Sequence, residues 1–214
     1  MKLALILRGI SYYNNANVEV SKSSVVDYKK CLESFRENLI KPLKTIFDKI
    51  DLFIITYDNE KISDIRCDFQ PVNEKIYPVG YIGKVDRETV VQQQMLDAVK
   101  LIESCDYEHI LITRFDLYYY NAINVADINL DKFNFGWIAD VGQADDNFLL
   151  FNKKDLHQLK NYFSRYNYPH GLNSFVNNPS YICKLDPGNG YHYPYFYIFG
   201  RCVDDYMNGK MKLV

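Results

Sequence analysis

The sequence predicts one α/β domain with a mostly parallel, mixed central sheet and helices on both faces of that sheet. Three continuous apolar runs of seven residues each, at 2–8, 51–57 and 109–115, are typical of strands that are buried on both faces. Segments with apolar residues at helical spacing separate these runs, so neighbouring strands are expected to be joined by crossover helices. A chain of 214 residues fits one such domain, and we expect residues 1–214 to form it.

The first crossover helix is expected to begin after Ser23 or Ser24, either of which can cap a helix. Apolar residues at roughly helical spacing continue from Val26 to Ile50, and Pro42 is expected to kink or split the helix. With the runs on either side, this segment predicts a right-handed βαβ unit.

The middle of the chain predicts a short strand near Lys75–Pro78, a helix over 87–104 and the strand 109–115. Beyond it the alternation is less regular. Strands are expected at 134–139 and 147–152, and a helix at 154–166. The tail is rich in Pro, Gly, Asn and Tyr, which predicts long loops with one strand near 195–199.

Composition argues against several classes of protein, among them nucleic-acid-binding, disulfide-bonded and membrane-spanning proteins. The net charge of −2 argues against a nucleic-acid partner, because such proteins normally carry a basic face. The cysteine count of five is odd and no pair has CxxC spacing, so we expect a reducing, cytoplasmic location without disulfides or a zinc site. The apolar N-terminal stretch is short and ends at Arg8, which predicts a first strand and no membrane span.

Polar residues follow three of the predicted strands: Arg8-Gly9 after the first, Tyr57-Asp58 after the second, and Arg114–Asp116 after 109–115. Ligands of open α/β sheets bind outside the carboxyl ends of the strands, so these three groups are expected to converge on a ligand. Asp116 is then placed where a hard cation can bridge a carboxylate and phosphate oxygens.

The segment HILITRFDLYY resembles the DxD site of GT-A glycosyltransferases, which have a Rossmann-like fold. In that family the last acid of the triplet binds Mn²⁺ or Mg²⁺, and this position is Asp116 here. The first position is Arg114, so one carboxylate stands where many relatives have two. The chain's size and its RGISYY start are similar to the compact capsid glycosyltransferases of large algal (chlorella) DNA viruses. That resemblance implies a UDP-sugar donor, a glycan or glycoprotein acceptor and, for a viral protein, the host cytoplasm.

The resemblance also implies roles for individual residues. Residues 1–120 would be the nucleotide-binding half, with donor contacts from Arg8, Gly9, Ile10, Tyr57, Asp58, Arg87, Arg114, Phe115 and Asp116. Gly9 would let the backbone approach a base or ribose, and Arg87 would suit phosphate recognition. Residues 121–214 would form the acceptor and catalytic half.

In that second half the candidate catalytic acids are Asp140, Asp145 and Asp146, which can accept a proton from an acceptor hydroxyl within hydrogen-bond reach. His192 is the candidate second metal ligand, in preference to His170. Two other functions stay open. One is a non-catalytic glycan-binding module of the same shape. The other is a sugar nucleotidyltransferase, which RGISYY fits poorly because that chemistry uses a Gly-rich, basic phosphate loop.

Overall fold

The computed structural model describes residues 1–13, 26–79, 87–136, 147–165, 182–184 and 196–198. The centre of the fold is a sheet of seven strands: β1 (Lys2–Arg8), β4 (Lys49–Tyr57), β5 (Asn73–Tyr77), β6 (His109–Arg114), β8 (Phe133–Phe135), β9 (Phe148–Asn152) and β10 (Ile182–Lys184). Their order is β10-β8-β9-β6-β1-β4-β5. Only β9 among these strands runs against its neighbours, so the sheet is mixed and mostly parallel.

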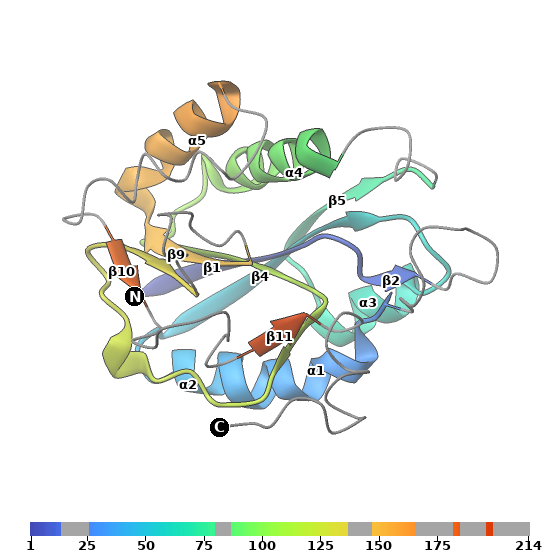
Figure 1. Cartoon of the computed structure of the whole chain (residues 1–214), viewed down its shortest axis with the longest axis horizontal. Coiled ribbons are helices and arrows are strands. Elements are labelled where there is room, and N and C mark those ends of the chain that lie inside the picture. Colours follow the sequence, from blue (N-terminus) through green and yellow to red (C-terminus); the bar gives the residue numbers. More distant parts are fainter. Residues whose placement is uncertain (14–25, 80–86, 137–146, 166–181, 185–195, 199–214) are drawn as a thin grey trace.

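Helices cover both faces of this sheet (Figure 1). One face carries α4 (Arg87–Ile102) and α5 (Leu156–Arg165). The other carries α1 (Lys29–Phe35), the π-helical turn η1 (Arg36–Ile40), α2 (Lys41–Leu43) and α3 (Ile62–Phe69). The expected α/β class is therefore confirmed.

The core is divided by the sheet into two layers, and β1 contributes to both. Ala4 and Ile6 pack toward α4, whereas Leu3, Leu5 and Leu7 pack toward α1 and α2. All five are buried. Because successive side chains of a strand point to opposite faces, this alternation explains why the strand is apolar throughout.

The chain changes direction across the sheet between β1 and β6. It first builds outward from β1 to β4 and β5, and it then crosses to the other side of β1 to form β6. Such a topological switch point leaves a crevice outside the carboxyl ends of the two strands concerned. Arg8 and Arg114 end these strands and are register partners.

The first crossover helix differs from its predicted bounds. Val26 lies in β3 (Val26–Asp27), which pairs with β2 (Tyr12–Tyr13), and the helix begins only at Lys29. The Asp27 side chain accepts a hydrogen bond from the Lys29 amide, which fixes the turn before the helix. Ser23 and Ser24 lie outside the described residues. The π-helical turn comes immediately before Pro42, whose missing N–H interrupts the α-helical bonding pattern.

Helix α3 and strand β10 are among the elements that were not expected from the sequence. Helix α3 buries Ile65 and Phe69 under the sheet, and β10 adds an edge strand. The tail strand near 195–199 is present as β11 (Phe196–Ile198) and pairs with β7 (Leu117–Tyr119) directly after Asp116. The 3₁₀ turns η2 (Val125–Asp127) and η3 (Lys153–Asp155) complete the described elements. None of the described helices combines the length and apolarity that crossing a membrane requires.

Candidate functional site

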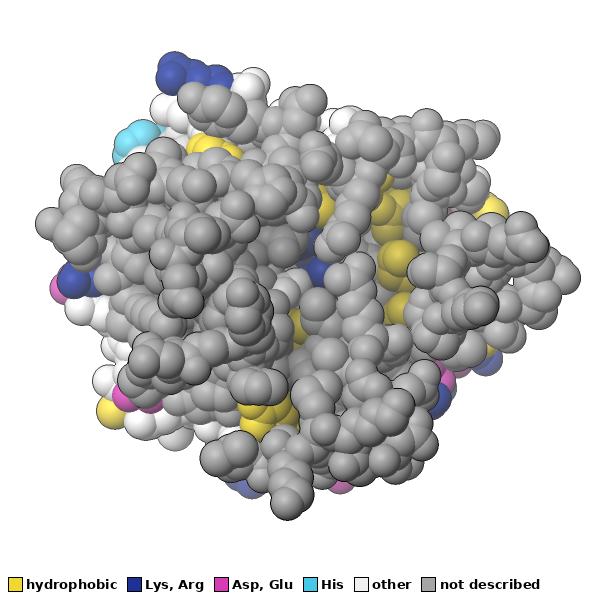
Figure 2. All heavy atoms as spheres, viewed as in Figure 1, with side chains coloured by type: hydrophobic (Ala, Val, Ile, Leu, Met, Phe, Trp, Pro, Cys, Tyr) yellow, Lys and Arg dark blue, Asp and Glu magenta, His cyan; other side chains and the backbone are white. Residues whose placement is uncertain are grey.

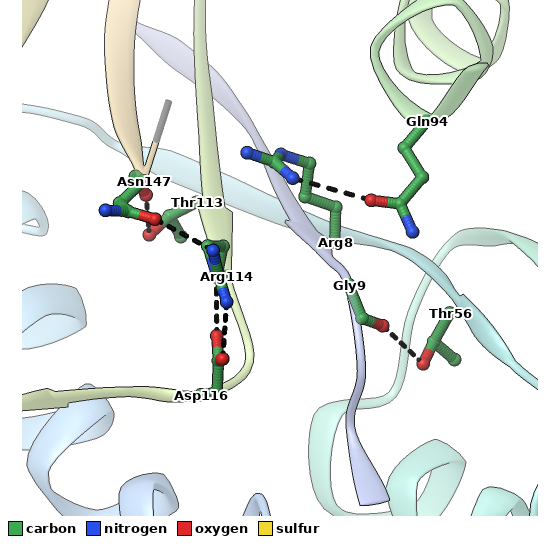
Figure 3. A network of polar contacts seen from close by, with 8 residues as sticks. All are labelled: Arg8, Gly9, Thr56, Gln94, Thr113, Arg114, Asp116 and Asn147. Atoms are coloured by element: carbon green, nitrogen blue, oxygen red, sulfur yellow. Dashed lines mark hydrogen bonds and ion pairs between the residues drawn. The ribbon is translucent and has the colours of Figure 1, made fainter. Parts of the chain in front are cut away.

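Arg8 is a buried cation at the carboxyl end of the central strand. Only 2% of the residue is exposed. Its guanidinium points toward α4, where Nη1 lies 3.4 Å from Oε1 of Gln94 (Figure 3). The Gln94 amide in turn donates to the Tyr57 hydroxyl at 3.1 Å, so one glutamine links the ends of β1 and β4. Burying a cation is costly, and a charge kept here by the fold is typical of a binding site.

The backbone turns sharply directly after Arg8. Gly9 has a φ of +97°, which an L side chain rarely adopts. Its amide donates to the Ile55 carbonyl at 3.0 Å, and its carbonyl accepts from the Thr56 hydroxyl at 2.8 Å. Thr56 also bonds Ser11 at 2.8 Å, so this turn is fixed from both sides. The strand end is therefore a rigid platform.

Arg114 and Asp116 form a two-pronged ion pair at the end of β6 (Figure 3). Nε of Arg114 lies 2.7 Å from Oδ1 of Asp116, and Nη2 lies 2.5 Å from Oδ2. Nη1 donates to Oδ1 of Asn147 at 3.0 Å. Asn147 is the residue before β9, and its carbonyl accepts from the Thr113 hydroxyl at 2.9 Å. Both oxygens of the carboxylate thus already have a cationic partner.

Two buried titratable groups lie near this edge. Burial raises the pKa of the Cys31 thiol to about 12, and the nearby Asp116 carboxylate adds to the effect. That thiol stays protonated and is no nucleophile at neutral pH. Burial pushes the pKa of Asp97 upward, but hydrogen bonds from Tyr77, Lys100 and Gln93 outweigh it and leave the pKa lowered. Asp97 is accordingly an ionised structural group of α4.

A divalent metal fits the described residues incompletely. No three His, Cys, Asp or Glu side chains within the described ranges come close enough together to hold an ion. Asp116 has both oxygens engaged by Arg114, and Asn147 offers one amide oxygen that also faces Arg114. The sequence predicts a carboxylate with a bound metal cation at this position. The described residues instead place a guanidinium beside the carboxylate.

The other predicted donor contacts differ in their accessibility. Ile10 packs partly buried against the α4 core, and Asp58 is exposed at the end of β4. The Phe115 ring is buried on the opposite face, 5.5 Å from the Phe69 ring. Tyr57 is buried with its ring 5.5 Å from that of Tyr77. Arg87 is the first residue of α4.

Four predicted residues lie outside the described part of the chain: Asp140, Asp145, Asp146 and His192. The flanks of the acidic segment are described. Gly136 donates its amide to the Phe148 carbonyl, and Asn147 bonds Arg114. The chain therefore leaves β8 and returns to β9 at the edge that carries Asp116.

The sequence predictions missed Gln94 and Asn147. A signal for Gln94 was present, because it lies three residues after Val91 and four before Ala98, on the inward stripe of α4. Asn147 precedes the apolar strand segment FLLF, and no sequence pattern pairs it with Arg114 across β6 and β9.

Comparison with models of known protein families finds no match for this chain, and comparison with curated protein sequences finds none either. The function is therefore inferred from the geometry of this edge.

Proposed function

We propose that this protein is a glycosyltransferase that moves a sugar from a nucleoside-diphosphate sugar, with UDP as the first candidate, to a glycan or glycoprotein hydroxyl. The observation that supports the proposal is the pairing of Arg8 and Arg114 at the switch point between β1 and β6. An anionic ligand in that crevice meets two guanidinium groups on neighbouring strands.

The rigid turn after Arg8 supports the nucleotide part of the proposal. Gly9 leaves space where a side chain would start, because none of the described residues places an atom within 4 Å of a β-carbon built there. A ribose or base can therefore approach this backbone closely. Tyr57 ends the next strand and Asp58 follows it, at the same edge of the sheet as Arg8.

In the proposed reaction, the bond between the sugar C1 and the diphosphate oxygen breaks, and its electron pair leaves with that oxygen. The acceptor hydroxyl oxygen forms the new bond to C1, and its proton passes to a carboxylate. Asp140, Asp145 and Asp146 remain the candidates for this base.

Thermal unfolding of the full chain with a panel of nucleoside diphosphates, each with EDTA and with Mn²⁺, tests this function. A ligand that binds only the folded state raises the midpoint. We expect one nucleoside diphosphate to raise it, and we expect Arg8→Met to abolish the rise. The matched control is Arg66→Gln, because the Arg66–Glu74 pair is also two-pronged but joins α3 to β5 and is exposed.

A midpoint that responds to free glycans but to no nucleotide would contradict the proposal and would favour the non-catalytic glycan-binding module. Formation of a nucleoside-diphosphate sugar from a nucleoside triphosphate and a sugar phosphate would instead identify a nucleotidyltransferase.

A further inference from the structure

The end of β6 carries a fixed organic cation beside its single carboxylate. Arg114 is 18% exposed and Asp116 8%, and the two are joined by two short charge-assisted hydrogen bonds. Asn147 holds the third nitrogen of the guanidinium. The position and the orientation of this charge are therefore set by the fold before any ligand arrives.

We propose that the Arg114 guanidinium supplies the positive charge for the donor diphosphate, so that donor binding needs no divalent metal. This inference rests on the proposed function and names the group that binds its diphosphate. Arg114 and Arg8 are register partners on parallel strands, so their side chains begin on the same face of the sheet. The Arg8 guanidinium then lies toward Gln94 and the Arg114 guanidinium toward Asp116 (Figure 3). Among the strand-end groups of β1 and β6, Arg8, Arg114 and Asp116 amount to two cations and one anion, a balance that favours an anionic ligand.

The geometry also opposes a metal at Asp116. A cation bound to that carboxylate would either share an oxygen with Arg114 or displace it, because both oxygens already accept hydrogen bonds from the guanidinium. In either case it would stand next to that positive charge. Like charges at such a separation repel strongly in a largely buried site. The planar, permanently charged guanidinium is suited to phosphate recognition and needs no exchange of ligands.

The arrangement has a clear chemical consequence for group transfer. When the bond between C1 and the diphosphate oxygen breaks, negative charge grows on that leaving oxygen. A preorganised cation stabilises it without a reorganisation cost at the moment of reaction. Asp116 acts here as a positioning residue that holds Arg114 in its orientation.

Figure 2 shows Lys or Arg side-chain atoms in the middle of the visible face beside hydrophobic side chains. The visible acidic side chains lie toward its rim.

Isothermal titration of UDP into the full chain, with EDTA and separately with Mn²⁺, tests the inference. For the native sequence we expect the Kd values for UDP in the two buffers to agree within about twofold. For Arg114→Gln we expect the affinity for UDP to fall by about tenfold or more, and we expect Mn²⁺ not to restore it. Arg66→Gln should bind like the native chain. Arg114→Lys keeps the positive charge but loses the planar guanidinium with its paired N–H donors. We expect its affinity for UDP to lie between those of the native protein and Arg114→Gln.

Native protein that binds UDP with Mn²⁺ but not with EDTA would overturn this inference while leaving the proposed function intact. If neither UDP nor any other nucleoside diphosphate binds in either buffer, both are wrong. The comparison of the two buffers uses the native chain, so it decides whether a metal is needed even if Arg114→Gln does not fold. Arg114→Lys, which keeps the charge, then tests the contribution of Arg114.

Discussion

Charged groups at the two ends of the central strands differ in how far they are exposed to water. At the amino ends, ion pairs join exposed groups: the N-terminal ammonium with Asp48, Lys2 with Asp106, and Lys49 with the less exposed Asp51. At the carboxyl ends of β1 and β6 the charges are largely buried, and they are held by Gln94, Asn147 and Asp116.

The difference shows at which edge of the sheet the folded protein keeps charges whose burial costs free energy. Exposed ion pairs contribute little to stability and are screened by salt. Buried charges often cost more than an apolar replacement would, so their retention at one edge is better explained by ligand binding than by folding. The contrast therefore supports the proposed ligand site at the carboxyl edge.

The largest expected effect follows from removing the Asp116 carboxylate. In Asp116→Ala the Arg114 guanidinium loses its anionic partner in a site that is mostly closed to water, and the free energy of unfolding should fall by about 3 kcal/mol. Urea unfolding measures this change. Asp106→Ala is the matched control at the amino edge, and an equal loss in both variants would contradict the contrast between the edges.

A smaller loss is expected when Gln94 becomes Leu. This variant keeps the volume but removes the amide between Arg8 and the Tyr57 hydroxyl, which should cost about 2 kcal/mol by leaving buried polar groups worse satisfied. Gln158→Leu in α5 is the comparison, because that amide bonds Asp155 near the surface. A Gln94→Leu protein as stable as the native one would show that the link is not structural.

Gly9→Ala tests the strained turn between Arg8 and Ser11. With a φ of +97° and no atom of the described residues within 4 Å of the added β-carbon, the cost should come from backbone strain, at about 1 kcal/mol. Thermal unfolding measures it. A neutral substitution would mean that the turn relaxes readily and does not hold the strand end.

The smallest expected effect is on the pH dependence of stability, and it involves His109 at the amino edge of the sheet. Burial lowers the pKa of His109 below its ordinary 6.5, against a smaller opposing effect of its hydrogen bond to the Leu130 carbonyl. As pH falls through 6.5, His109 is protonated in the unfolded chain but stays neutral in the folded chain. The free energy of unfolding therefore declines below pH 6.5 from its value above that pH. Unfolding midpoints measured from pH 7 to 5 should fall less for His109→Gln, and parallel curves for the two proteins would refute the assignment.

The central strands follow from the sequence to within two residues, because an apolar run that is buried on both faces has few alternatives. The same holds for the long helix α4, with its sustained inward stripe. The first crossover helix was predicted too long at both ends, since local spacing could not reveal that Val26 pairs with Tyr13 or that Ile50 joins β4. Helix α3 is short and only two of its residues are buried, a signal too weak to predict it.

The sequence by itself determined that Arg8, Gly9, Arg114 and Asp116 end their strands, and parallel pairing was enough to bring them to one edge. Only the tertiary structure decided that Arg114 turns back onto Asp116 and that Asn147, from a strand on the far side of β6, holds it there. Strand order and side-chain partners depend on contacts between residues distant in the chain, and no local pattern records them. For that reason the carboxylate that the sequence predicts as a metal ligand is, in the folded protein, the partner of a guanidinium.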